Sequence, residues 1–168
     1  MEVTTRTHKL ACNLVLAALL VPTLAYCGPR LRYITAGPML HWNFGNGPSA
    51  LSIGLEAAYW DYPPGDQVFS DGPTVPGDGE IGYGVDLGVE WEKNKLRIYA
   101  EPQLGMAVAG VSMGPVLEWN KEIQAFDFGA QGSIWANPIF AGADLRGRII
   151  GGRKYLVPGL SAKLPIPL

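Results

Sequence analysis

The sequence predicts an all-β fold, a closed antiparallel up-and-down β-barrel of about eight strands that spans a membrane. Three observations support this prediction. Apolar and polar residues alternate with a period of two from residue 31 onward, which is typical of strands. Only 17% of the residues are charged, whereas 48% are hydrophobic and 22 are glycines. An apolar run near the N-terminus has the layout of an export signal.

Residues 1–27 are predicted to be a cleaved signal peptide, and residues 28–168 form the predicted barrel domain. A stretch with a lysine and an arginine precedes the apolar run Leu14 to Val21, which Pro22 ends. This run is shorter than the ~20 apolar residues that a spanning helix needs. The length therefore favours a cleaved signal over a membrane anchor.

The two cysteines, Cys12 and Cys27, lie in or at the predicted signal, so no disulfide is expected within the mature domain. Cys27 also resembles the acylated cysteine of a lipoprotein signal. Tyr26 departs from that pattern, which requires a small residue before the cysteine. We therefore expect Cys27 to remain without a lipid.

Charge argues against one class of partner. Removing Glu2, Arg6 and Lys9 with the signal reduces the 13 basic and 15 acidic residues to 11 and 14, a formal charge of −3. Because a basic footprint is missing, we do not expect the protein to bind nucleic acid.

Eight segments alternate clearly enough to be predicted as strands. They cover residues 31–44, 50–60, 80–92, 95–105, 109–119, 122–135, 139–150 and 154–166. In chain order, the apolar positions are the even ones from Ile34 to Phe44, the odd ones from Leu51 to Tyr59, the odd ones from Ile81 to Trp91, the even ones from Leu96 to Leu104, the odd ones from Val111 to Trp119, the even ones from Phe126 to Ile134, the odd ones from Ala141 to Ile149, and the even ones from Leu156 to Ile166.

Most connections between these segments are short, which favours a meander of neighbouring antiparallel strands. Asn94, for example, suits the tight turn between the third and fourth segments. Eight such strands can close into a barrel, and closure removes exposed edges. Strands of ~11 residues tilted by ~40° match an apolar band of ~25 Å.

Alternation alone does not say which face points inward, since a soluble barrel of lipocalin type would hold its apolar face inside. The size of the side chains favours the opposite arrangement, with the apolar face outside. The apolar face carries large side chains, and the lumen of an eight-stranded barrel is narrow. The positions of the aromatic residues also favour an outward apolar face. In an antiparallel meander most of the large aromatic residues fall near strand ends, which is where a membrane interface would lie. The expected interface aromatics are Trp42, Phe44, Trp91 and Trp119 at one rim, and Tyr59 and Trp135 at the other.

The polar face then lines the lumen, where charges must be paired or hydrated. We call the expected charged set the lumen network: Glu56, Asp86, Glu90, Arg97, Glu101, Glu118, Asp127, Asp144, Arg146, Arg148 and Lys163. Counting outward from the turn at Asn94 puts Glu90 across from, or diagonal to, Arg97. The sequence therefore predicts that Arg97 pairs with Glu90, and that the lumen is plugged instead of forming an open pore.

The pattern resembles that of the small outer-membrane barrels of the OmpA/OmpX type, over residues 31–166 and without a diagnostic motif. The resemblance implies an outer-membrane location, a lipid bilayer and the outer-membrane assembly machinery as partners, and a structural or surface role. Two features depart from it. The chain ends on Leu168 instead of an aromatic residue, and its one long connection, 61–79, falls on the same side as the N-terminus.

Candidate chemistry is sparse, and we expect no catalytic residue, cofactor or metal. His41 is the only histidine after the signal, and Ser52 and Glu56 share its polar face on the next strand. A lipid-modifying enzyme centred on His41 is therefore one alternative. A soluble lipocalin-like periplasmic carrier is another. The connection 61–79 is rich in aspartate, whose carboxylate oxygens are ligands that calcium prefers. The spacing of these aspartates is not that of an EF-hand, so a solvated loop is favoured.

Overall fold

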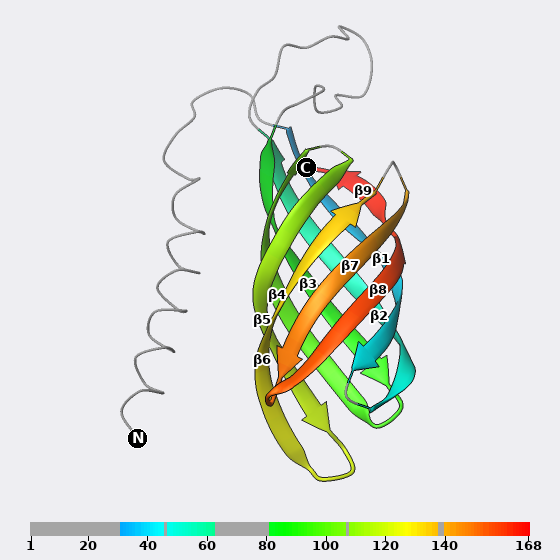
Figure 1. Cartoon of the computed structure of the whole chain (residues 1–168). Helices are drawn as coiled ribbons and strands as arrows, with labels where there is room; N and C mark the ends of the chain where they lie inside the picture. The colour runs from blue at the N-terminus through cyan, green and yellow to red at the C-terminus, as the bar shows by residue number, and fades with distance from the viewer. Residues whose placement is uncertain (1–30, 46, 63–80, 107, 138–139) are drawn as a thin grey trace, which may run out of the picture.

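The computed structural model describes residues 31–45, 47–62, 81–106, 108–137 and 140–168 (Figure 1). The predicted signal peptide, Cys27 and most of the connection 61–79 lie outside the described residues.

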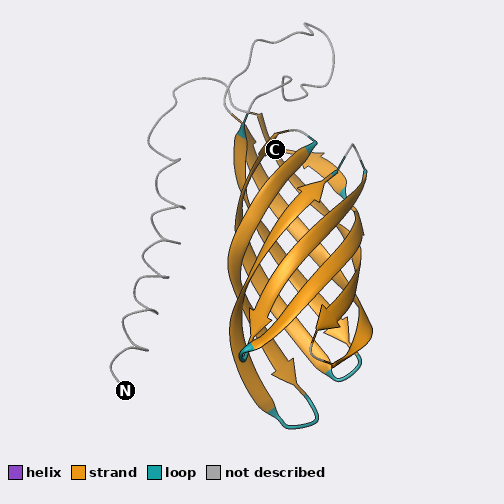
Figure 2. Cartoon of the chain, in the orientation of Figure 1, coloured by secondary structure: helices purple, strands orange, loops and turns teal. Residues whose placement is uncertain are grey.

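The described residues form strands joined by turns (Figure 2). Among them, no helix is long and apolar enough to cross a membrane. The strands are β1 (Leu31–Gly45), β2 (Gly47–Tyr62), β3 (Gly82–Glu92), β4 (Lys95–Met106), β5 (Ala109–Asn120), β6 (Ala125–Ala136), β7 (Ala141–Ile150), β8 (Arg153–Ala162) and β9 (Leu164–Pro167).

Each of the strands β1 to β8 pairs antiparallel with its sequence neighbours, and β1 also pairs with β8, which closes the barrel. The tilted strands wrap around a common axis (Figure 1). The predicted fold class, an all-β closed antiparallel barrel of eight strands, is thereby confirmed. The eight predicted segments also match the strands in order.

The last predicted strand is divided into two. β8 pairs with the second half of β1, from Met39 to Gly45, whereas β9 pairs with its first half, from Tyr33 to Ala36. β9 pairs with β1 alone among the described strands, so it is a short edge strand. Its two prolines, Pro165 and Pro167, cannot donate a ladder hydrogen bond and suit such an edge.

The two ends of the barrel differ, and we name them for what they carry. The turn rim holds the hairpin turns after β1, β3, β5 and β7 and is the lower end in Figure 1. The terminal rim holds the start of β1 and the C-terminus. β2 ends and β3 begins at the terminal rim, on the side that the sequence predicts for the connection 61–79, and the turn rim joins its strand pairs by short connections.

Side chains alternate between wall and lumen in the orientation that the sequence predicts. In β3, Leu87 is 55% exposed on the outer wall, while Glu90 is completely buried. The outer wall is apolar along the other strands as well, as at Ile53, Ile98 and Leu160. Polar and charged side chains fill the interior.

Glycines make room for large side chains in this narrow lumen. Gly88 lies opposite Tyr99, and a Cβ atom at this glycine would come within 2.1 Å of the Tyr99 ring. The ring cannot move away freely, because the Tyr99 hydroxyl donates a 2.5 Å hydrogen bond to Glu56.

We therefore expect Gly88→Ala to destabilise the barrel by about 1–3 kcal/mol through overpacking. Gly147→Ala is the matched control, since a Cβ atom there meets nothing within 4 Å. Urea unfolding of the refolded variants measures both effects. Equal stability of the two variants would show that Tyr99 does not depend on the space above Gly88.

Candidate functional site

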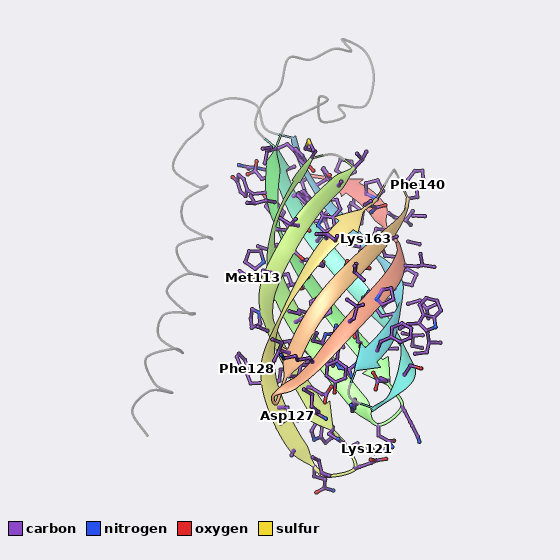
Figure 3. All side chains as sticks on the ribbon, in the orientation of Figure 1. Met113, Lys121, Asp127, Phe128, Phe140 and Lys163 are labelled. Carbon is purple, nitrogen blue, oxygen red and sulfur yellow. The ribbon has the colours of Figure 1, made fainter. Side chains whose placement is uncertain are left out.

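The lumen is the part of the molecule where charged groups meet, and all members of the lumen network face it. Eight are buried, namely Glu56, Asp86, Glu90, Arg97, Glu101, Glu118, Arg146 and Arg148. The other three, Asp127, Asp144 and Lys163, are half-buried. Figure 3 shows Lys163 within the upper half of the barrel.

Arg148 and Glu90 meet across the lumen, reaching each other from β7 and β3. Nη2 and Nη1 of Arg148 donate to the two carboxylate oxygens of Glu90 at 2.6 and 3.0 Å. Such bidentate pairs are strong because both donor and acceptor are charged. Arg148 Nε donates to the side-chain oxygen of Gln131 at 2.6 Å. The arginine therefore links β3, β6 and β7 across the lumen.

A second group lies between the centre and the terminal rim. Arg146 Nη2 donates to Glu56 at 2.5 Å, and Tyr99 donates to the same carboxylate oxygen. The Lys163 ammonium pairs with the other oxygen of Glu56. The guanidinium of Arg146 also lies 4.8 Å from the Tyr99 ring centroid, within cation–π range. Glu56 is thus neutralised by two cations at once.

A third group lies toward the turn rim and corrects the predicted pairing. Glu90 and Arg97 are direct cross-strand partners, as expected, but their charged atoms are 3.6 Å apart. Arg97 is closer to Glu118, at 2.7 Å, and to Glu92, at 2.8 Å. The predicted pair is therefore a secondary contact. Glu90 instead has its best partner, Arg148, on the opposite wall.

Sequence analysis missed several residues that complete this interior. Arg153, at the start of β8, pairs with Glu118 at 2.9 Å and with Asp127 at 2.6 Å. Ser112 donates to Glu101 at 2.8 Å. Ser112 lies on the polar face that the strand period predicts, so only its partner was not predicted, whereas Arg153 fell in a predicted turn.

The structure does not assemble a triad around His41. Its Nδ1 lies 2.9 Å from Glu90 and its Nε2 lies 3.2 Å from Asp144, so carboxylates occupy both ring nitrogens. Ser52 donates to the main-chain oxygen of His41 and not to its ring. Glu56 is engaged by the second group described above. His41 is also completely buried, so the lipid-modifying alternative has no exposed nucleophile–base pair in this arrangement.

Five of the six expected interface aromatics lie on the outer wall, and one does not. Trp42, Phe44, Tyr59, Trp91 and Trp119 are each more than a third exposed. Trp135 was assigned wrongly, because it shares the odd-numbered face of β6 with Gln131 and Ser133, which point inward. Its ring packs inside against Trp60, at 5.3 Å between ring centroids.

Of two cavities formed by described residues, neither is a large internal site. A hollow of about 540 Å³ lies on the outer wall, where Leu40, Ile53, Leu55 and Trp91 give it an apolar lining. The interior cavity, near Asp86 and Lys163, measures about 20 Å³, which is space for roughly one water molecule. Among the described residues, no group of His, Cys, Asp or Glu side chains could hold a metal ion. This interior cavity, formed by described residues, is far smaller than the apolar ligand of a lipocalin-like carrier would need.

This chain was compared with known protein families, sequences and solved structures, and only the solved structures gave matches. No protein-family model matches this chain, and no curated protein matches its sequence. Neisserial surface protein A is similar in structure, with a TM-score of 0.45 and 11% identity over 84% of this chain and all of that one. Ail, the attachment invasion locus protein of Yersinia pestis, has a TM-score of 0.24 and 10% identity over 83% of this chain and all of that one. The function proposed below rests on this chain's own geometry.

Proposed function

We propose that this protein is an outer-membrane β-barrel with a structural or surface-interaction role and a closed lumen. The observation that carries the proposal is the inversion of the usual arrangement of side chains. Large apolar side chains such as Ile53, Leu87 and Ile98 stand on the outer wall, and charged ones lie inside.

A lipid bilayer is the environment that suits such a wall. Soluble monomers rarely expose contiguous apolar surface on this scale, because water around it is unfavourable. A closed barrel satisfies its backbone hydrogen bonds internally and leaves no open edge in the hydrocarbon, apart from short segments near a rim. The predicted signal peptide supports export to the compartment from which the outer-membrane assembly machinery would insert the barrel.

Packing of the interior supports a closed lumen over an open pore. Side chains from opposite walls touch at its centre, as Arg148 and Glu90 do. His41, Glu90, Glu101 and Glu118 are completely buried, although they project from different strands. We therefore assign the protein a role that uses its outer surfaces, and no transport of solutes.

Fractionation and conductance test this proposal together. The protein should fractionate with the outer membrane, require detergent, and migrate differently on a gel before and after heating. In planar bilayers it should show no large stable conductance. Recovery as a monodisperse soluble protein would contradict the membrane assignment, and a large steady current would contradict the closed lumen.

A further inference from the structure

Exposed lysines are concentrated at the turn rim. Lys93 lies in the turn after β3, Lys121 lies in the turn after β5, and Lys154 follows the turn after β7. All three are exposed, and none pairs with a carboxylate among the described residues. Two other basic residues of this rim, Lys95 and Arg153, are by contrast partly buried and paired with Glu118.

The positive charge at this rim is not balanced by nearby acids. Glu122 is the one exposed acid among the described residues of the turn rim, and it accepts a hydrogen bond from Asn94. Asp127 is half-buried and bound to Arg153. The lysine ammonium groups of the three turns are therefore free to meet an external anion.

Aromatic side chains of the outer wall lie close in sequence to two of these lysines, Lys93 and Lys121. Trp91 and Trp119 are each two residues before an exposed lysine of the adjoining turn. Trp119 stacks on Phe126, with 5.9 Å between ring centroids. Tryptophan prefers the headgroup level of a bilayer. Figure 3 shows Lys121 at the lower end, beyond Phe128 on the wall. With these tryptophans at the headgroup level, Lys93 and Lys121 would stand at the depth of lipid phosphates.

The terminal rim has no comparable group among its described residues. Arg32 is half-exposed and pairs with Asp61 at 3.3 Å. Lys163 points into the lumen, where it pairs with Glu56. The exposed, unpaired positive charge of the described barrel is therefore found at one end.

We propose that the turn rim binds the phosphate groups of anionic lipid headgroups and gathers anionic lipids around this end of the barrel. The inference rests on the proposed function, because it requires the barrel to lie in a bilayer. A lysine ammonium offers three donors to phosphate oxygens, and basic residues near a membrane surface attract anionic lipids. Lys93, Lys121 and Lys154 belong to three different hairpins of this rim, so each would attract lipid at its own part of the rim.

Tryptophan fluorescence gives a direct test with the natural protein. Trp42, Trp91 and Trp119 lie on the outer wall near the turn rim, whereas Trp60 and Trp135 lie in the lumen. The protein is reconstituted in phosphatidylcholine vesicles with a minor fraction of phosphatidylglycerol. One of the two lipids carries bromine atoms, which quench tryptophan, and both are compared at the same mole fraction.

We expect brominated phosphatidylglycerol to quench at least about twofold more than brominated phosphatidylcholine, because the lysines enrich it locally. High salt should reduce this excess by screening. The combined variant Lys93→Gln, Lys121→Gln and Lys154→Gln should lose the excess, while Arg32→Gln at the terminal rim should keep it.

The outcomes separate this inference from the proposed function. Equal quenching by the two lipids, or an undiminished excess in the triple variant, would overturn the lipid site while leaving the barrel in the bilayer. Absence of quenching by either lipid would show that the barrel is not inserted, and would overturn both proposals.

Discussion

Replacing Arg148 with methionine should destabilise the barrel by about 3–5 kcal/mol, the usual cost of breaking a buried ion pair from one side. The Arg148 side chain is completely buried, and it donates to both carboxylate oxygens of Glu90. Methionine removes these donors and leaves the buried Glu90 carboxylate with Arg97, at 3.6 Å, as its nearest guanidinium. Unfolding by urea in lipid vesicles measures the loss.

A second substitution shows whether the loss comes from the stranded charge. Glu90→Gln in the Arg148→Met background should recover part of the stability, because the amide is neutral and can still bond to His41. Lys154→Met is the matched control for removing a basic side chain, since Lys154 is exposed and should change stability little. Additive losses in the double variant would contradict a direct Arg148–Glu90 pair.

Leu87→Arg is expected to cost roughly 2–4 kcal/mol on folding into a bilayer, as a charge does near the midplane of a membrane barrel. Leu87 is 55% exposed on the outer wall and lies near the middle of β3, opposite Ala100. The cost arises because the guanidinium must lie in hydrocarbon or reach for the interface.

An arginine placed near the rim of the barrel, instead of near its middle, is the control for Leu87→Arg. Ile81→Arg places the same charge just before β3 begins, at the terminal rim, where an arginine costs only about 0–1 kcal/mol. The ratio of folded to unfolded protein in vesicles of fixed lipid composition measures both variants. Equal costs at the two positions would show that the wall around Leu87 does not lie in hydrocarbon.

The sequence period was sufficient to predict the strands and the two faces of the barrel. In β3 each residue from Gly82 to Glu92 lies on the face that alternation predicts, because a regular strand turns successive side chains to opposite sides. The same rule applied to β6 would have placed Trp135 inside. Its wrong assignment came from its position near a strand end and not from a defect in the strand.

Partners within the lumen could not be predicted in the same way. Cross-strand neighbours follow from register, and Glu90 does lie opposite Arg97. The lumen is so narrow, however, that long side chains also meet across it, as Arg148 of β7 and Glu90 of β3 do. Those two strands are far apart in the sheet order, so their contact depends on closure and strand tilt.

Methyl contacts with lipid provide the most direct test of the central claim, that the apolar wall faces the bilayer and the polar face forms a closed interior. Leu117 is 37% exposed on the outer wall, while the adjacent Val116 is 1% exposed. Leu156 and Val157 form a second such pair, at 53% and 0%. Nuclear Overhauser contacts between methyl groups and lipid acyl chains are measured in nanodiscs. We expect acyl-chain contacts at Leu117 and Leu156 and none at Val116 and Val157, and the opposite pattern would contradict the claim.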